Sequence, residues 1–221
     1  MKDSTDGQEL STAEYWNDRY ATANGHEWFK SFAALQPFFG KHLLSSRSKD
    51  SRILHLGSGD STIPSDLARL GYRNQICVDF SKVVVDLMSI PEASSLGITW
   101  LQADVRNLSA AGLDDGSVDV AFDKGTLDAI IHGSPWDPPE DVLENTRKYM
   151  DEVVRVLKDD GVFLYITFRQ PHFVKPLINC RDQWKLEMEV LGDEGGGFDY
   201  HAFILRKAGS ERCDGTDASG P

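Results

Sequence analysis

Glycines and a carboxylate stand at a spacing that suits cofactor binding. The apolar run 52–56 leads into Gly57-Ser58-Gly59, and a second apolar run ends about twenty residues later in Asp79. In α/β folds a glycine turn brings backbone and a helix N-terminus close to a cofactor, and an acid ending the next strand accepts hydrogen bonds from a ribose. The turn alone is weak evidence, because many βα turns use glycine. The turn together with the spaced acid favours a nucleotide-like cofactor over a purely structural role.

The residues after the second glycine indicate which cofactor. A dinucleotide-binding turn has a third glycine three residues further on, where the helix packs closely on the strand. This chain has Thr62 there, preceded by Asp60 and Ser61. A carboxylate at the mouth of that helix would repel a pyrophosphate, but it suits a cofactor that carries an ammonium or a sulfonium group. The sequence therefore favours S-adenosylmethionine over a nicotinamide dinucleotide.

Two later strand ends also carry acids. Asp104 follows the third expected strand, where it can accept the exocyclic amine of adenine while Val105 offers a backbone N–H; a turn-capping role fits Asp104 equally well. The segment 122–129, with Asp123 and Asp128, follows the fourth strand, at the edge where ligands bind in open α/β sheets. Its residues either start a helix or line the methyl-transfer pocket, and the sequence leaves both roles open.

Aromatic residues gather ahead of the expected sheet, at Tyr15, Trp16, Tyr20, Trp28 and Phe29. An aromatic stripe most often packs in a core. This segment has to pack over a face or the carboxyl edge of the sheet, however, and there it can form a lid over the adenosyl group that attracts a sulfonium through cation–π contacts. Both interpretations stand at this point.

The elements that position these residues alternate between strands and helices. After a helix from Ser11 or Thr12 and a second one over about 31–39 that ends near Gly40, we expect strands near 52–56, 74–79, 98–102, 118–122, 161–168, 184–190 and 199–206. Helices are expected near 61–70, 81–89, 126–131, 140–157 and 172–178. Such alternation predicts a parallel sheet with right-handed crossovers, and the short link 192–197 predicts an antiparallel hairpin.

The expected fold class is therefore α/β: a Rossmann-like, class I methyltransferase fold. It has a seven-stranded, mostly parallel sheet, a C-terminal antiparallel hairpin and helices on both faces. We expect one domain over residues 11–208. Residues 1–10 and 209–221 are polar and poor in apolar side chains, so the sequence predicts a disordered N-terminus and a disordered tail.

Composition restricts the partners. The chain has 40% hydrophobic and 26% charged residues and a net charge of -12, which is a soluble globular balance. Nucleic acid is not expected as a partner, because neutralising phosphates takes a basic stripe. The acidic charge would attract a basic protein, although it equally serves to keep the domain soluble.

Membrane, export and metal signals are not visible in the sequence. No apolar run approaches the ~18 residues of a membrane span, and the polar, acidic start resembles neither a signal nor a transit peptide. The three cysteines, Cys77, Cys180 and Cys213, lie far apart, so we expect free thiols in a reducing, cytoplasmic compartment. No pair among the six histidines has metal-ligand spacing, and we expect no metal site.

Six segments together resemble the methyltransferase-like protein-lysine methyltransferases, and most closely the enzymes that modify translation elongation factor 1 alpha. The segments are 15–20, 28–29, 56–61, 78–81, 104–106 and 123–129. The Tyr-Trp-x-x-Arg-Tyr opening and the Lys-Gly-Thr-Leu-Asp-Ala run are specific, whereas the glycine turn is not. The resemblance covers about residues 12–207. It implies methyl transfer from S-adenosylmethionine to a protein lysine; a small-molecule methyltransferase, or a non-catalytic binding module on this fold, remains the alternative.

The resemblance also implies site residues. It places the family's cofactor contacts on Trp16, Tyr20, Trp28, Gly57, Asp79, Phe80, Asp104, Val105 and Lys124, and the glycine turn adds Ser58 and Gly59. Ser58-Gly59-Asp60 stands where the family usually has Cys-Gly-Asn. His55 stands where many class I enzymes carry an acid, a change that weakens a contact to the methionine ammonium unless Asp60 replaces it. No unique general base is evident; Asp128 and His132 are candidates on position.

Overall fold

The structure is a computed structural model that describes residues 7–22, 25–179, 181–192 and 199–208. Its strands are β1 (Ile53–Leu56), β2 (Gln75–Asp79), β3 (Ile98–Gln102), β4 (Val118–Lys124), β5 (Leu157–Thr167), β6 (Trp184–Leu191) and β7 (Tyr200–Lys207). They form one sheet in the order β3-β2-β1-β4-β5-β7-β6. Strands β1 to β5 are parallel, and β7 is antiparallel to both β5 and β6. The mostly parallel sheet with a closing hairpin is confirmed.

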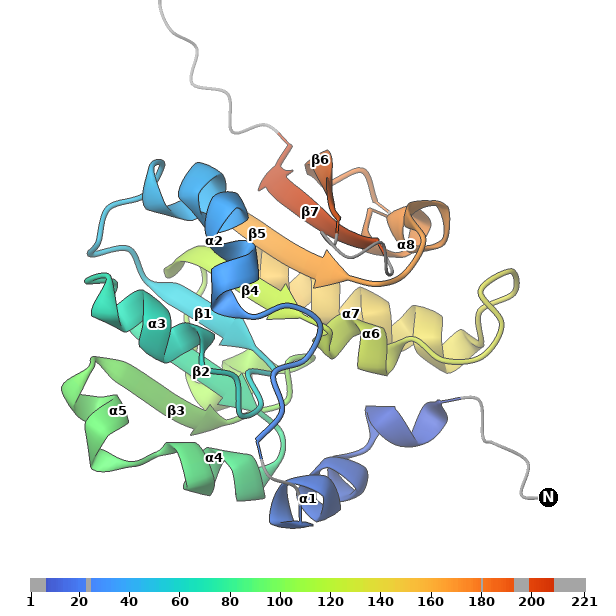
Figure 1. Ribbon diagram of the computed structural model, residues 1–221. Helices are drawn as coiled ribbons and strands as arrows, with labels where there is room; N and C mark the ends of the chain where they lie inside the picture. The colour runs from blue at the N-terminus through green and yellow to red at the C-terminus, as the bar shows by residue number, and fades with distance from the viewer. Residues whose placement is uncertain (1–6, 23–24, 180, 193–198, 209–221) are drawn as a thin grey trace, which may run out of the picture.

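The helices lie on both faces of this sheet (Figure 1). The α-helices are α1 (Ala13–Thr22), α2 (Phe32–Phe39), α3 (Ile63–Arg69), α4 (Lys82–Met88), α5 (Pro91–Ser95), α6 (Thr126–Ile130), α7 (Glu140–Val156) and α8 (Pro171–Ile178). Two 3-10 turns, η1 (Gln8–Ser11) and η3 (Leu108–Ala111), and a π turn, η2 (Gly40–Leu44), complete the described elements. Among the described residues, no helix is long and apolar enough to cross a bilayer.

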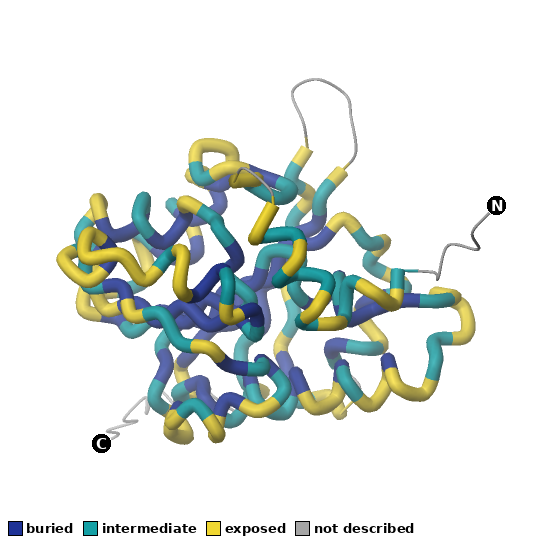
Figure 2. The backbone as a smooth tube through the Cα atoms, turned by 90° about the horizontal axis from the view of Figure 1, so that it is seen from below, coloured by how far each residue is buried: buried dark blue, intermediate teal, exposed yellow. Residues whose placement is uncertain are grey.

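Two apolar cores hold the layers together. One core packs the side chains of α6, α7 and α8 against the sheet, around residues such as Tyr149 and Phe163. The other packs α2 and α3 against the opposite face, around Phe39 and Phe122. Every residue of β1 and β2 is buried, as expected of parallel strands covered on both sides. Figure 2 shows this buried backbone in the middle of the molecule and the exposed segments around it.

The structure corrects the sequence expectation at a few boundaries. The helix expected to end near Gly40 continues through η2, because Gly40 keeps right-handed helical angles and the extra turn buries Leu43. Strand β5 begins at Leu157 rather than near residue 161, since Leu157 already pairs with Val118. The short elements α5 and η3 were not expected from the sequence.

The N-terminal segment crosses the carboxyl ends of the parallel strands. Helix α1 packs against α4, and η1 packs against α6, so the segment spans the side of the molecule where β1, β2 and β4 end (Figure 1). Turn η1 lies partly within the range 1–10 for which the sequence predicts disorder. Residues 1–6 and the tail 209–221 lie outside the described residues.

Candidate active site

A cavity opens at the carboxyl ends of β1, β2 and β4, beneath the N-terminal segment. The eleven cofactor contacts expected from the sequence all lie on its wall: Trp16, Tyr20, Trp28, Gly57, Ser58, Gly59, Asp79, Phe80, Asp104, Val105 and Lys124. They come from six separate stretches of chain; the parallel sheet brings the four strand-end stretches together because its strand ends share one edge, and the N-terminal segment adds the other two.

The turn between β1 and α3 depends on its two glycines. Both have left-handed backbone angles, with φ of 59° at Gly57 and 53° at Gly59, a conformation that costs little only for glycine. A Cβ at Gly57 would lie 2.1 Å from Thr126 Oγ1, and one at Gly59 would lie 2.6 Å from the hydroxyl of Tyr20. The turn is therefore fitted closely between α6 and the N-terminal segment.

Asp79 ends β2 and faces this turn. One carboxylate oxygen accepts a hydrogen bond from the Gly59 backbone N–H at 3.0 Å, and the other accepts one from the Ser81 N–H at 2.9 Å. The side chain is buried, and this burial raises the pKa of Asp79 to about 6. The acid is thus held at the place where the sequence predicts a ribose partner, with lone pairs left over for further hydrogen bonds.

Polar atoms without a partner lie around the same turn. Asp60 accepts the His26 N–H with one carboxylate oxygen at 3.0 Å, while its other oxygen is buried and has no hydrogen-bond partner among the described residues. The indole N–H of Trp28 is likewise buried and has no hydrogen-bond partner among the described residues. Buried polar groups are normally paired, so these atoms indicate a ligand that offers a donor to Asp60 and an acceptor to Trp28.

His55 cannot take over from the acid that it replaces. Its ring is buried, and burial lowers the pKa of His55 to about 4. Its Nε2 lies 2.7 Å from the Gln75 side-chain oxygen, so the neutral ring has a partner within the protein. Of His55 and Asp60, Asp60 is the residue with an acceptor atom that has no partner among the described residues.

Asp104 is held by a neighbour that the sequence did not single out. Arg106 donates to both of its carboxylate oxygens, the shortest distance being 2.7 Å, and the Arg106 backbone N–H donates to Oδ1 at 2.9 Å. Burial works to raise the pKa of Asp104, but the bonds from Arg106 outweigh it and the pKa is lowered. Asp104 therefore caps its turn and lines the cavity at once, the two roles that the sequence left open.

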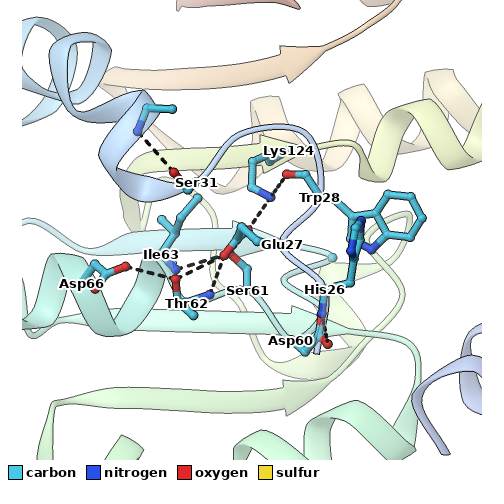
Figure 3. Close-up of polar contacts among 12 residues, drawn as sticks. His26, Glu27, Trp28, Ser31, Asp60, Ser61, Thr62, Ile63, Asp66 and Lys124 are labelled. Carbon is cyan, nitrogen blue, oxygen red and sulfur yellow. Dashed lines mark hydrogen bonds and ion pairs between the residues drawn. The ribbon is translucent and has the colours of Figure 1, made fainter. Parts of the chain in front are cut away.

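Lys124 contacts the N-terminal segment. Its buried ammonium donates to Glu27 Oε1 at 2.7 Å and to the carbonyl of Trp28 at 2.5 Å. Glu27 also accepts the Ser61 hydroxyl at 2.8 Å and the Thr62 N–H at 2.9 Å, which satisfies one donor at the start of α3. Figure 3 shows Glu27 at the centre of these contacts.

Nothing in the sequence pointed to Glu27. Its neighbour Trp28 belongs to the family-like motif, and that adjacency is the one signal available. Burial works to raise the pKa of Glu27, but the attraction of Lys124 and the bonds from Ser61 and Thr62 outweigh it and the pKa is lowered. The carboxylate is therefore ionised at neutral pH. It joins three parts of the chain: the N-terminal segment up to Phe29 (the N-terminal arm), the glycine turn and the end of β4.

The aromatic set covers the cavity. Helix α1 has no buried residues, so its aromatic side chains do not form part of the core. Trp16 stacks on Tyr20 with ring centroids 5.7 Å apart and meets Trp28 edge-on at 5.8 Å, and all three line the cavity together with Phe29. Tyr15 instead meets Trp16 edge-on from outside. Of the two interpretations left open, this arrangement favours the lid.

The segment 122–129 serves both roles that the sequence allowed, although β4 continues to Lys124, two residues beyond the expected end of the strand. Asp123 is fully buried and accepts the N–H groups of Thr126 and Leu127, so it starts α6. Asp128 lines the cavity; it accepts the Tyr165 hydroxyl at 2.8 Å and the Thr167 hydroxyl at 2.6 Å. Burial raises the pKa of Asp128 to about 6.

His132, the other candidate base, does not belong to the cavity wall. Its Nε2 lies 3.0 Å from Asp141 Oδ2, and this contact ties together the two ends of the loop between α6 and α7. Asp128 is therefore the candidate of the two that can meet a bound molecule.

Phe29 of the aromatic set forms the mouth beside Asp128 together with Phe168 and Arg169, which the sequence did not single out. Phe29 and Phe168 meet edge-on with centroids 5.6 Å apart, and Phe29 has a left-handed φ of 61°, a strain of the kind that gathers at ligand clamps. Arg169 donates to the Asp128 carbonyl at 3.1 Å, and its Nε lies 3.7 Å from the Asp128 carboxylate. This second part of the cavity combines apolar walls with one carboxylate and one guanidinium. Among the described residues, no group of acids, histidines or cysteines converges to hold a metal ion.

Comparison with known proteins identifies the family. A family model described as a methyltransferase domain matches residues 47–208. The chain is 32% identical over 200 residues to EEF1A lysine methyltransferase 4 of Mus musculus, covering 88% of this chain and 74% of that one. It is 27% identical over 192 residues to the eEF1A lysine and N-terminal methyltransferase of Homo sapiens, covering 84% of this chain but 26% of the human protein.

Solved structures share the fold. A SAM-dependent methyltransferase from Leishmania major superimposes with a TM-score of 0.63 at 13% identity, over 89% of this chain and 86% of the other. One from Aquifex aeolicus does so with a TM-score of 0.56 at 15% identity, over 86% and 97%. The family model spans most of the chain and the mouse relative is more than 30% identical, so the chain belongs to the methyltransferase-domain family and is an S-adenosylmethionine-dependent methyltransferase.

Proposed function

We propose that the protein methylates a lysine amine of a protein, and that translation elongation factor 1 alpha is its substrate. One observation carries this proposal: relatives from Mus musculus and Bos taurus, each 32% identical over 88% of this chain, are named EEF1A lysine methyltransferase 4. The similarity covers 88% of the chain, rather than the glycine turn alone.

The cavity has the groups that S-adenosylmethionine requires. When bound, this cofactor supplies a methyl group on a sulfonium with a good leaving group. We assign Asp79 to the ribose hydroxyls, the unpartnered oxygen of Asp60 to the methionine ammonium, and the cover over the adenosyl group to Trp16, Tyr20 and Trp28. Lys124 supports the cover through Glu27 rather than by a contact of its own ammonium with the cofactor, because that ammonium already has partners.

The second part of the cavity suits the lysine. A lysine amine has a pKa of about 10.4 and has to lose its proton before it can attack. The rings of Phe29 and Phe168 desolvate the amine, which lowers the lysine pKa, and the positive charge of Arg169 opposes the effect of the Asp128 carboxylate, which favours the ammonium form. Asp128 offers a fixed acceptor for an N–H of the neutral amine, which orients the nitrogen lone pair.

We place the enzyme in the cytoplasm. The described free cysteine, Cys77, is a buried thiol, as is usual in a reducing compartment. We further assign residues 11–208 to a single methyltransferase domain, because the N-terminal arm completes the wall of the cavity that the sheet begins.

The test is transfer of labelled methyl groups to purified elongation factor 1 alpha, with each lysine examined by mass spectrometry. We expect incorporation at one lysine, and none with a variant that cannot bind the cofactor, such as Gly59→Trp. A metabolite screen runs in parallel. Robust methylation of a small molecule without incorporation into any lysine of the elongation factor would refute the protein substrate.

A further inference from the structure

A tryptophan stands almost free in solvent beside the cavity mouth. Trp136 is 81% exposed, and it lies on the loop between α6 and α7 that projects beside α8 (Figure 1). Indole rings are large and apolar, and a ring this exposed buries little apolar area, so it contributes little to the stability of the folded domain. Exposed aromatic rings of this kind are typical of surfaces that bind another molecule.

The loop that carries Trp136 is held in one shape. His132 and Asp141 clamp its two ends at 3.0 Å. Gly133 has a left-handed φ of 72°, and the Pro139 ring packs so close that a Cβ at Gly133 would lie 2.8 Å from it. The backbone N–H of Trp136 donates to the Ser134 hydroxyl at 3.3 Å. Three prolines between residues 135 and 139 restrict the backbone further.

The ring itself is also supported. Trp136 meets the Phe173 ring edge-on with centroids 4.7 Å apart, and His172 lies 6.3 Å away. Both belong to the first turn of α8. These contacts hold the indole in place before a partner binds, so little conformational entropy is lost when a partner covers it.

This surface is continuous with the acceptor side of the cavity. Phe168 and Arg169 line the cavity and directly precede α8, and Phe168 is 49% exposed. The Arg169 guanidinium donates to the carbonyl of Ile131, at the start of the same loop. The surface thus runs from the cavity mouth, over Phe168 and the first turn of α8, to Trp136.

The loop side of this surface is acidic. From residue 125 to residue 146 the sequence has no Lys or Arg, and Asp137, Glu140 and Asp141 are exposed there. Asp141 is hydrogen-bonded to His132, so Asp137 and Glu140 are the exposed carboxylates of this loop that stay available to a partner. An exposed indole flanked by carboxylates is complementary to lysine and arginine side chains, through cation–π and ionic attraction.

We propose that Trp136, Phe168, His172 and Phe173, with Asp137 and Glu140, form a docking surface for the basic segment of the protein substrate that flanks the target lysine. This inference rests on the proposed function and extends it, because it states how the substrate is recognised outside the cavity. Docking at this surface delivers the lysine to the mouth next to Asp128, and Trp136 is the anchor of the contact.

The experiment compares Trp136→Ala with Leu87→Ala in steady-state methylation of purified elongation factor 1 alpha. Leu87 is also an exposed large apolar residue, at 55%, but it lies on α4. We expect Trp136→Ala to raise the KM for the protein substrate by about tenfold or more, with an unchanged kcat and unchanged S-adenosylmethionine affinity by calorimetry. Leu87→Ala should leave all three values as in the wild type. Asp137→Asn with Glu140→Gln should raise KM less and reduce its dependence on salt.

The outcomes separate this inference from the proposed function. A wild-type enzyme that labels no lysine of the elongation factor overturns the proposed function and the docking surface with it. An active wild type whose KM is unchanged by Trp136→Ala overturns the docking surface alone. Because Trp136 contributes almost no buried area, thermal unfolding of the variant should match the wild type, and a loss of activity through misfolding would be seen there.

Discussion

At the scale of single residues, three buried carboxylates stand out: Asp79 and Asp128 line the cavity, and Asp123 starts α6. Asp79, Asp123 and Asp128 are each almost fully buried, and burial raises the pKa of each, to about 6, 7 and 6. All three nevertheless accept hydrogen bonds with both oxygens or with several donors. They are positioned acceptors whose orientation is fixed before any ligand arrives, which is what a site for aligning two reactants requires.

Replacing Asp79 tests the cofactor assignment. We expect Asp79→Ala to weaken S-adenosylmethionine binding by about 1–3 kcal/mol, because ribose hydroxyls lose a buried acceptor. Isothermal titration calorimetry measures it. Asp119→Ala, which removes a carboxylate at the opposite end of β4, is the matched control and should bind normally. Unchanged affinity in Asp79→Ala would count against the assignment, as would micromolar binding of a nicotinamide dinucleotide.

Replacing Asp128 tests the electrostatics of the acceptor side. The pKa of Asp128 is raised in the folded protein. The folded protein therefore binds a proton on this carboxylate more tightly than the unfolded chain does. Its contribution to the free energy of unfolding is present at low pH and is lost as the pH rises from about 4 to about 6, by on the order of 2 kcal/mol.

Urea unfolding from pH 4.5 to 7.5 measures this effect as the difference in pH slope between wild type and Asp128→Asn. The comparison is needed because buried His55, with its lowered pKa, contributes stability in the opposite direction over the same range. We expect the free energy of unfolding of Asp128→Asn to fall less than that of the wild type as the pH rises. We also expect the substitution to lower kcat more than it lowers the affinity for the cofactor. Parallel pH slopes of the two proteins would mean that folding does not raise the pKa of Asp128.

At the scale of elements, the N-terminal arm is what completes the site. Helix α1 contributes nothing to the buried core, yet Trp16 and Tyr20 form part of the cavity wall. The arm is held at residues 26–29, where Glu27 and the Trp28 carbonyl bind Lys124 and Asp60 binds the His26 N–H, and also at Asn17, whose side-chain oxygen accepts the Ser81 hydroxyl. A few polar contacts therefore determine whether the cavity has a cover.

Glu27→Gln tests this dependence. Removing the charge leaves buried Lys124 without its ionic partner, and such a loss costs about 3–5 kcal/mol where the remaining charge cannot reach water. Here the arm can lift and hydrate Lys124, so the cost should appear as opening of the arm. We expect faster hydrogen exchange over residues 13–29 and weaker cofactor binding, with a nearly unchanged global unfolding transition.

Two further variants make that test specific. Glu14→Gln changes an exposed acid of α1 and should alter neither exchange nor binding. A double-mutant cycle with Lys124→Met should give a clear coupling energy between Glu27 and Lys124. Additive effects of the two substitutions would contradict the role assigned to this ion pair.

At the scale of the whole molecule, charge affects the encounter with the substrate. The chain has a net charge of -12, and a charge of this size attracts a basic partner over distances comparable to the Debye length. That length shrinks from ~10 Å at 0.1 M salt to ~3 Å at 1 M. Attraction of this kind raises the association rate more than it changes the chemical step.

Methylation of the elongation factor should therefore become slower as salt is added. We expect kcat/KM to fall steadily across a potassium chloride series, while kcat at saturating substrate changes little. Initial rates of labelled-methyl incorporation give both values, and calorimetry of S-adenosylmethionine over the same series is the control. A kcat/KM that does not depend on salt would exclude electrostatic attraction as part of substrate recognition.

The order and class of the elements were determined by the sequence itself. Apolar runs separated by glycine turns and amphipathic stretches predicted each strand of the sheet to within a few residues, and the handedness and pairing rules left few ways to arrange them. The same local patterns predicted that the glycine turn, Asp79 and Asp104 share one edge, because parallel strands end together. These are properties of short stretches of chain and of general topology.

The tertiary structure alone decided which side chains hold one another. Glu27 meets Lys124 across 97 positions of sequence, and Arg106 binds the carboxylate of Asp104. Asp128 reaches the cavity, whereas His132, four residues later, turns to Asp141. A hydrogen bond or an ion pair depends on distances of a few ångströms between segments remote in sequence, and no periodicity or spacing within one segment contains that information.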